Sequence, residues 1–395
     1  MIIAFSFGYR TFEVFNGFFI HPIELIIFAS VIRILIFKPK KYHPIPYSIY
    51  LIAYIFTIYL LVDIFTRYNI FILNEFKNSI HLFTIFFIFQ FIKLSDEYLK
   101  NVFKTYILSI TIISSLGILE FSFPHFIANI FGHGINPDSL TNKILFQRLL
   151  FLFWGSPLGA NLIPPIFPMI LYLRINNNRH LKTFTTITVI ILINLIAVYL
   201  SGNRISWLIL TVMLLIMLFQ FRNRLFPNNP NIKLYVIAIL LGFIIYIYSQ
   251  PVEGRYLSMF KAIAGQIDSR YDSSSANRMY KAQIAISSII SNPFGLGWSS
   301  QGWVHNDILQ IAATTGVFNA FIFIFGLFTV LLKLYRKLIS RASEYYSFYY
   351  AAFNIMIYVT ISFALNGNLL LVQTGAPLFL MWALFSNKIH YLIEN

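Results

Sequence analysis

Long apolar runs recur along the chain and are separated by short polar segments. A helix needs about 20 mostly apolar residues to cross the hydrocarbon core of a bilayer. Runs of roughly this length predict eleven membrane-spanning helices, at residues 19–37, 47–65, 79–94, 102–120, 148–173, 183–200, 205–221, 234–250, 307–332, 347–366 and 373–392. Residues 2–18 are apolar enough for a twelfth, although Arg10 and Glu13 argue against it. The pattern therefore predicts an all-α, polytopic membrane helical bundle.

One long hydrophilic stretch, residues 251–306, interrupts this rhythm of short connections. Long loops of this kind are usually functional or disordered, and this one keeps many aromatic residues. Within it, apolar residues recur at helical spacing over 279–290, and Pro293 then ends the pattern. We predict a small helical cap outside the cytoplasm. The membrane domain is then divided into a first part (1–250), a periplasmic loop or cap (251–306) and a last part (307–395).

Composition narrows the class of protein further. Apolar residues make up 58% of the chain and charged residues only 11%, whereas soluble domains have about a quarter charged residues. A cytosolic enzyme, a disordered protein and a secreted disulfide scaffold are thereby excluded. The chain has no cysteine, so thiolate metal sites and cysteine nucleophiles are excluded as well. The net charge of +15 does not point to nucleic acid, because the basic residues form no single patch.

Most of the positive charge follows the rule that cytoplasmic loops are rich in Lys and Arg. Alternate loops carry clustered basic residues, which predicts a cytoplasmic C-terminus; these are Lys38, Lys40, Lys41, Lys93, Lys100, Lys104, Arg174, Arg179, Lys182, Arg222, Arg224, Lys233, Lys333, Arg336, Lys337, Arg341 and Lys388. Ten basic residues fall on the opposite side, and six of them lie in the turn 201–204 or the segment 251–306. These six run against the topology bias, which suggests an anionic ligand.

Three short polar segments are each expected to precede a helix on that outer side. They are Ser201–Arg204, Ser274–Arg278 and Trp303–Asp307. Ser275 or Asn277 is a plausible N-cap for the second helix, and Asn306 or Asp307 for the third. Arg204 and Arg278 would then lie in first helical turns, where a cation is unfavourable unless an anion binds there. The same dipole would favour a neutral imidazole at His305, which a general base needs.

Each of these residues also has a purely structural interpretation. Arg204 can extend to lipid headgroups, Arg278 can be a solvated loop residue, and His305 can be a polar cap. Arg255 can join an anion pocket or balance nearby acids. Trp298 and Trp303 can stack on sugar or anchor the chain at the interface. His125 and His133 show no metal-ligand pattern, and Gly295-Leu296-Gly297 lacks the third glycine of a dinucleotide fingerprint, so we predict no metal and no cofactor.

Taken together, the motifs resemble a known family. Asn277-Arg278, an amphipathic helix, Asn292-Pro293-Phe294-Gly295-Leu296-Gly297, then His305-Asn306-Asp307-Ile308-Leu309-Gln310 and Gly316 follow in the order found in the O-antigen ligase and O-antigen polymerase superfamily. The turn Ser201–Arg204 resembles the small-residue-plus-Arg turn of that family. The motifs cover roughly residues 183–332.

The resemblance implies a multi-pass protein of the bacterial inner membrane whose active site faces the periplasm. Its donor would be an undecaprenyl-diphosphate-linked oligosaccharide, used without a metal. Arg204 and Arg278, with Arg255 as a further candidate, would bind the diphosphate, and His305 would deprotonate or orient the acceptor hydroxyl. Asn306, Asp307, Gly295 and Gly297 would support the motif. The expected partners are this lipid-linked glycan, the bilayer, and a chain-length regulator and flippase.

Polymerase and ligase remain alternatives. A polymerase joins lipid-linked repeat units to one another, whereas a ligase transfers the glycan to lipid A–core. Ligases often carry a longer outer segment than residues 251–306, so the short segment favours a polymerase by analogy. A transporter or flippase of lipid-linked glycan is a weaker alternative, because only Pro164, Pro165 and Pro168 interrupt a span. A non-enzymatic scaffold would tolerate substitution of His305.

Overall fold

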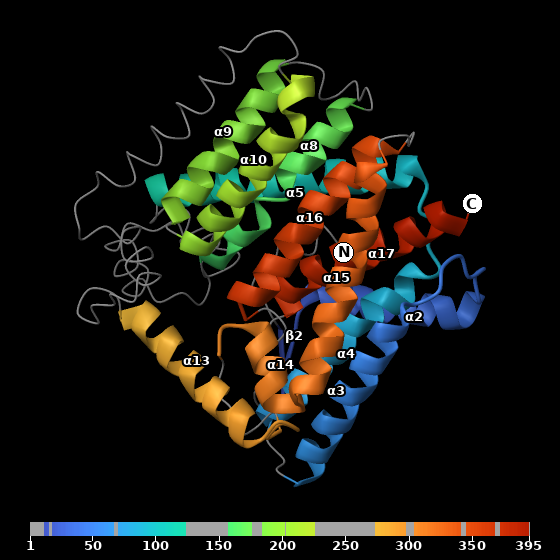
Figure 1. The fold of residues 1–395 in the computed structure, drawn as a ribbon, viewed down its shortest axis with the longest axis vertical. Coiled ribbons are helices and arrows are strands. Elements are labelled where there is room, and N and C mark those ends of the chain that lie inside the picture. Colours follow the sequence, from blue (N-terminus) through green and yellow to red (C-terminus); the bar gives the residue numbers. More distant parts are fainter. Residues whose placement is uncertain are drawn as a thin grey trace.

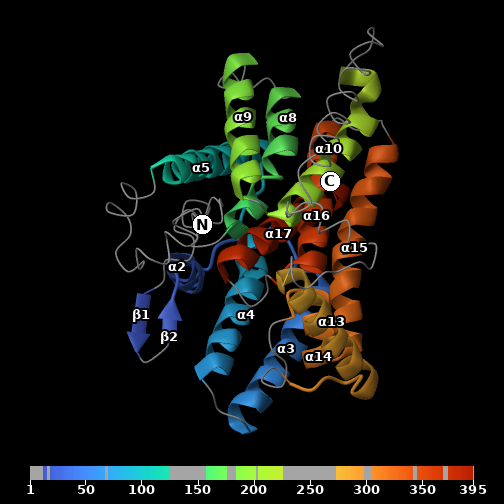
Figure 2. The same ribbon diagram turned by 90° about the vertical axis from the view of Figure 1, so that its left-hand side faces the viewer.

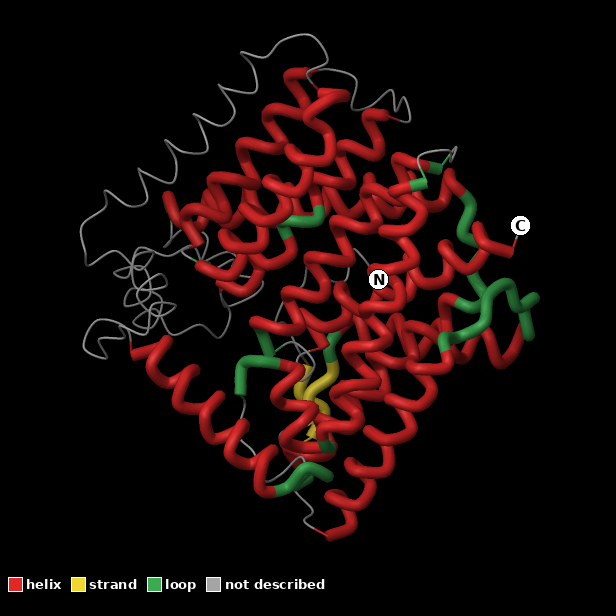
Figure 3. The backbone as a smooth tube through the Cα atoms, in the orientation of Figure 1, coloured by secondary structure: helices red, strands yellow, loops and turns green. Residues whose placement is uncertain are grey.

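The structure is a computed structural model and describes residues 12–15, 18–66, 70–123, 157–175, 184–201, 203–225, 273–297, 304–340, 345–367 and 372–394. Nearly all of these residues are helical, which confirms the predicted all-α bundle (Figure 3). The exception is a short antiparallel hairpin in which β1 (Phe12–Phe15) pairs with β2 (Phe18–Ile20).

The first part of the chain folds into four helices among the described residues. They are α2 (Pro22–Phe37), α3 (Tyr47–Thr66), α4 (Ile70–Phe89) and α5 (Asp96–Ser122). Local sequence explains two of the helix starts. His21 accepts a hydrogen bond from the Ile23 amide while Glu24 accepts one from the His21 amide, a capping box, and Ser95 caps α5 by accepting from Tyr98 N.

The middle of the chain is built from shorter apolar helices. The predicted span 148–173 appears in the described residues as a 3-10 turn, η1 (Pro157–Leu162), followed by α8 (Ile166–Ile175). Pro164 and Pro165 lie between the two, and proline removes the amide that a continuous helix requires. After α8 come α9 (Phe184–Ser201) and α10 (Arg204–Leu225), and Figures 1 and 2 place α8, α9 and α10 together at one end of the molecule.

The last part of the chain contains α13 (Ser273–Ser291), α14 (Asp307–Thr315), α15 (Val317–Ile339), α16 (Tyr346–Leu365) and α17 (Val372–Glu394). The predicted single span 307–332 is therefore wrong in one respect, because Gly316 divides it into α14 and α15. At Gly316 the backbone has φ 96°, which favours glycine and ends a right-handed helix. Both ribbon views place α13 beside α14, at the end of the molecule that also holds α3 (Figures 1 and 2).

Among the described residues, four helices are long and apolar enough to cross a membrane: Tyr47–Thr66, Asp96–Leu119, Val317–Ile339 and Tyr346–Leu365. Shorter apolar helices cover Ala160–Ile175, Thr185–Ser201 and Ile205–Met217. These elements are consistent with a polytopic membrane protein. The span predicted at 234–250 lies outside the described residues.

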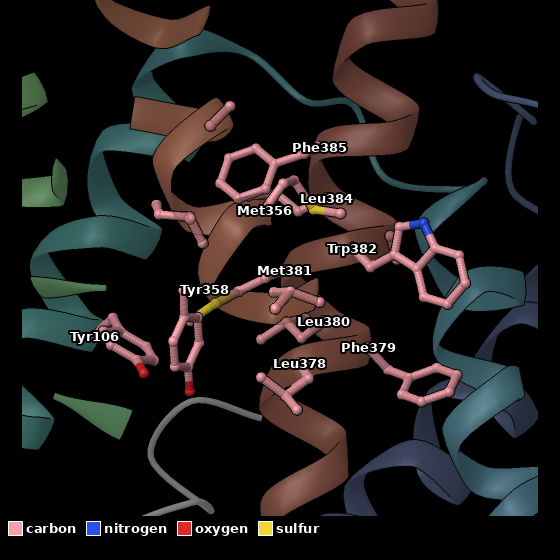
Figure 4. Packing of buried hydrophobic residues seen from close by; sticks show 14 of the residues in the cluster. Tyr106, Met356, Tyr358, Leu378, Phe379, Leu380, Met381, Trp382, Leu384 and Phe385 are labelled. Atoms are coloured by element: carbon pink, nitrogen blue, oxygen red, sulfur yellow. The ribbon is translucent and has the colours of Figure 1, made fainter. Parts of the chain in front are cut away.

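Aromatic side chains fill the centre of the bundle. The Trp382 indole of α17 makes edge-to-face contacts with Phe86 of α4 and Phe323 of α15, with ring centroids 5.3 and 5.5 Å apart. Phe379, one turn earlier on α17, packs against Phe83 and Phe363. Figure 4 shows Trp382 and Phe379 on the same side of α17. These contacts fix α4, α15 and α16 around α17.

Candidate active site

The site is built around α14, whose N-cap residue Asn306 directly follows His305. The Asn306 side chain caps this helix, because its Oδ1 accepts a hydrogen bond from Leu309 N at 2.9 Å. Its Nδ2 donates to the Ala364 carbonyl near the end of α16. Of the two predicted caps, Asn306 is therefore the one used, and the fully buried Asp307 lies in the first turn. Asn306 thus fixes the start of α14 against α16.

His305 has an unusual backbone conformation. Its φ of 59° lies in the left-handed region, which costs most side chains free energy and often marks functional sites. The ring is half-buried and lies within electrostatic reach of Arg278 and Lys281 on α13. Burial and these two cations lower the pKa of His305 to about 4. The imidazole is therefore neutral at pH 7.

Arg278 lies on α13, as predicted, but not in its first turn. The helix begins at Ser273, so the predicted caps Ser275 and Asn277 are inside it. Residues 273–277 contain neither glycine nor proline, and nothing in them stops a helix. Because the helix dipole acts mainly on the first turn, the predicted unfavourable dipole contact of Arg278 is not present. The Arg278 side chain is exposed, and its electrostatic contact with His305 is the one predicted association that the described side chains display.

The glycine-rich turn after α13 connects to the other side of α14. Leu296 N donates to Ala313 O and Gly297 N to Thr314 O, both at 3.0 Å, while Val317 N donates to Pro293 O at 2.9 Å. The turn thereby satisfies carbonyls at the end of α14 that the helix itself leaves unpaired. Its amides are engaged in this contact, which gives Gly295 and Gly297 a structural role.

Two of these glycines are required by space as well as by backbone angle. Gly295 and Gly297 have φ of 88° and 86°. A Cβ on Gly295 would lie 2.5 Å from Thr314 O, so the turn could not approach α14 with any other residue there. Gly316 also lies close to the turn, since its Cβ would lie 3.0 Å from Phe294 O. The glycine motif is therefore a close backbone contact between the turn and the break that separates α14 from α15.

Helix α3 supplies two residues that the sequence patterns did not single out. Tyr59 donates a hydrogen bond from its hydroxyl to Phe294 O, and the buried carboxylate of Asp63 lies against Gly297. Tyr59 and Asp63 are four residues apart and so lie on one helix face. The sequence could have indicated Asp63, because it is the one acid in the apolar run 47–65. A carboxylate in a membrane span is usually functional.

A second polar junction lies between α9 and α10. Asn203 caps α10 by accepting from Ile205 N and Ser206 N, and its Nδ2 donates to Asn161 Oδ1 of η1 at 3.1 Å. The Ser206 hydroxyl donates to the same Asn161 oxygen at 2.6 Å. Arg204 is the first residue of α10, as the sequence predicted. The Arg204 side chain, and all of Arg255, Trp298 and Trp303, lie outside what the structure describes.

The described residues offer no group of three or more His, Asp or Glu side chains placed to hold a metal ion. What they do offer is a neutral imidazole beside two cations at one end of the bundle. Such a site can accept a proton from a hydroxyl group and can attract a phosphate-bearing substrate.

A comparison with protein families adds an independent finding. Residues 188–325 match the family described as O-antigen ligase. The match covers about a third of the chain and extends from α9 to α15, so it contains Arg204, Arg278, the glycine turn and His305. No curated protein matches the chain. The match supports the resemblance drawn from the motifs and indicates a function of the O-antigen polymerase or ligase class.

Proposed function

We propose that this chain is an O-antigen polymerase, a function of the class that the family match indicates. It would join undecaprenyl-diphosphate-linked oligosaccharide repeat units at the periplasmic face of the bacterial inner membrane. The observation that carries this proposal is His305, a half-buried neutral imidazole at the mouth of α14 beside Arg278 and Lys281. The short outer segment, residues 251–306, supports polymerase over ligase by analogy.

The proposed reaction is a single inverting displacement. The acceptor hydroxyl oxygen attacks the anomeric carbon of the donor sugar, and the bond from that carbon to the diphosphate oxygen breaks. His305 takes the hydroxyl proton, and the electron pair of the broken bond leaves with the diphosphate. Arg278, with Arg204 and Arg255, would stabilise the leaving charge. Positioning, charge stabilisation and one base are sufficient, because a diphosphate is a good leaving group.

The electrostatics of His305 fit this reaction. Burial, together with Arg278 and Lys281, lowers its pKa to about 4 in the chain alone, where the imidazole is a weak base. A diphosphate bound beside Arg278 would oppose these two positive charges and raise the pKa toward the working pH. Donor binding would therefore strengthen the base at the moment when it is needed.

A ligase that transfers the glycan to lipid A–core is the second candidate, favoured by the description of the matching family. Both reactions use the same donor and the same chemistry at the anomeric carbon. They differ in the acceptor, which the neighbouring segment 298–303, with the predicted sugar-contacting Trp298 and Trp303, would help to bind.

The deciding experiment is a gel of surface glycans from a strain that lacks the gene. A polymerase defect leaves lipid A–core with one repeat unit and no ladder, whereas a ligase defect leaves bare core and glycan on the lipid carrier. Wild type should restore the ladder, and His305→Ala and Arg278→Ala should not. Arg336→Ala, which removes an exposed arginine from the last turn of α15, is the matched control and should restore it. Full rescue by His305→Ala would refute the catalytic assignment.

A further inference from the structure

A cavity of about 290 Å³ lies at the other end of α3 from Asp63. Ser48, near the start of α3, lines it, together with residues of α15, α17 and the segment 44–46. Ser48 and Asp63 are fifteen positions apart on α3, or about 22 Å along the helix axis. The cavity and the His305 site are therefore separated by most of the thickness of a hydrocarbon core.

The lining changes from apolar to polar along two helices. On α15 it runs from Gly326 through Val330 to Lys333, and on α17 from Trp382 through Ser386 to His390. Each set repeats at three to four residues, so each lies on a single helix face. The inner end of the cavity is therefore apolar and the outer end polar, which matches the two halves of an amphiphile.

Trp382 forms the inner wall. Its ring is 1% exposed, packs against the aromatic core on one side, and approaches Gly326 on the other. A Cβ on Gly326 would lie 3.0 Å from Trp382 Cζ2 and 3.2 Å from Ser48 Oγ. The missing side chain at Gly326 thus lets α3, α15 and α17 meet at this wall, which separates the cavity from the core seen in Figure 4.

The polar end has donors and a positive charge but no acid. None of the described residues that line the cavity is Asp or Glu. Across the described part of the chain, Lys333 has no ion-pair partner, and the hydroxyls of Ser48 and Ser386 have no hydrogen-bond partner. Lys333 of α15 and Ser386 of α17 therefore offer donors at the polar end, while Ser48 of α3 offers a hydroxyl at the inner wall. A phosphate group could accept hydrogen bonds from Lys333 and Ser386.

We propose that this cavity binds the phosphate of an anionic phospholipid headgroup, with the glycerol and first acyl carbons against Trp382 and Val330. Its position supports this ligand, since Lys333 belongs to the basic loops that the sequence places in the cytoplasm, where the leaflet carries anionic lipid. The site is independent of the glycan transfer proposed above. A bound lipid would hold together the parts of α3, α15 and α17 that line the cavity.

The test is equilibrium binding by calorimetry with the full chain, purified and delipidated in detergent. The probes are dioctanoyl phosphatidylglycerol, dioctanoyl phosphatidylcholine and glycerol 3-phosphate. Both headgroups carry the phosphate, but the choline cation of phosphatidylcholine cancels its charge and would be repelled by Lys333. Phosphatidylglycerol should therefore bind saturably and about ten-fold more tightly than phosphatidylcholine. Binding of glycerol 3-phosphate with equal affinity would keep the phosphate site and assign a free phosphate ester as its ligand.

Substitutions locate the binding. Lys333→Gln should weaken phosphatidylglycerol binding about ten-fold and Ser386→Ala about three-fold, since the latter removes a neutral donor. Arg336→Gln removes an exposed cation three residues from Lys333 that does not line the cavity, and should change the affinity less than two-fold. Equal affinity for phosphatidylcholine would overturn the proposal, because it would show no preference for an anionic headgroup. A loss of affinity in Arg336→Gln as large as that in Lys333→Gln would also overturn it, because it would show attraction without a specific site.

Discussion

Asp63 of α3 occupies the space that a side chain on Gly297 would need. A Cβ on Gly297 would lie 2.6 Å from Asp63 Oδ1 and 3.0 Å from Oδ2. The two residues are far apart in sequence, yet the carboxylate is 4% exposed and packs directly against the glycine turn. The glycine turn also donates hydrogen bonds to the last carbonyls of α14. His305 lies at the other end of that helix, directly before its N-cap Asn306. The position of His305 thus depends on α3 through the turn.

Gly297→Ala should displace the turn from α3 and lower glycan transfer at least ten-fold. The added methyl group meets the Asp63 carboxylate, and the positive φ adds about 1–2 kcal/mol of backbone strain. Asp63→Ala in the same chain removes the clash but not the strain, so the double variant should recover part of the thermal stability. The measurement is the Tm of the four purified proteins together with transfer in vitro. Additive Tm losses would show that Asp63 and Gly297 do not interact.

The activity of the enzyme should depend on pH through His305. Its pKa is lowered to about 4, so kcat/KM should stay flat across the neutral range and fall as the pH drops toward about 4. The same shift affects stability. A native imidazole that resists protonation stabilises the fold above the ordinary histidine pKa near 6.5, and this contribution is lost as the pH falls through about 4.

Removing one of the cations beside His305 should shift the pH at which kcat/KM falls, the acid limb of the pH profile. Lys281→Ala takes away a positive charge that lowers the His305 pKa, so the limb should shift to higher pH while the maximal rate changes little. Arg336→Ala removes an exposed cation from the last turn of α15 and should leave the limb in place. A limb that stays at the same pH in Lys281→Ala would show that His305 is not the titrating group.

The cap of α14 gives a graded test of the same region. Asn306→Ala should cost about 1 kcal/mol of unfolding free energy for the lost cap, and more if the Ala364 carbonyl stays unpaired. Asn306→Asp keeps the capping oxygen but loses the donor to Ala364, so its stability should lie between those of the wild type and Asn306→Ala. Denaturant titration of the three proteins measures this order. Equal stability of Asn306→Asp and Asn306→Ala would mean that the cap contributes nothing.

The sequence predicted the presence of helices well, but it predicted poorly where a helix begins or breaks. Periodicity over 279–290 located α13, but its start was misplaced, because Ser275 and Asn277 are good caps and the helix begins at Ser273 instead. Capping preference is weak where the upstream residues also tolerate a helix. In the predicted spans, hydropathy alone does not change at Gly316, where the backbone turns because the segment around Phe294 contacts it.

The sequence allowed a candidate site to be proposed from residues that are close along the chain, but not the part of it that depends on tertiary contacts. His305 and Arg278 belong to one short stretch of chain, so their motifs could be read from the sequence. Asp63 lies on a distant helix, and only the fold brings it to Gly297. The sequence displayed the charge of Asp63 in an apolar run but contained nothing that connects it to the glycine motif.

A buried ion cluster between α2 and α4 allows a double-mutant test of the fold. Lys77 Nζ lies 3.0 Å from Glu24 Oε1, and His81 Nδ1 lies 3.2 Å from the same oxygen. The Glu24 side chain is 2% exposed, so Lys77→Met leaves a buried carboxylate without its cation and should cost about 3–5 kcal/mol. Adding Glu24→Gln removes the unpaired charge and should restore much of that loss.

The thermal stabilities of wild type, both single variants and the double variant form a complete cycle. Glu24→Gln alone should destabilise the protein less than Lys77→Met does, because the Lys77 side chain is 14% exposed and its charge can reach solvent, whereas the Glu24 side chain is only 2% exposed. Lys337→Met, which removes a lysine from the last turn of α15, is the control and should change Tm little. If the double variant is as unstable as the sum of the single variants, Lys77 stabilises the bundle through packing of its carbon chain and not through its charge.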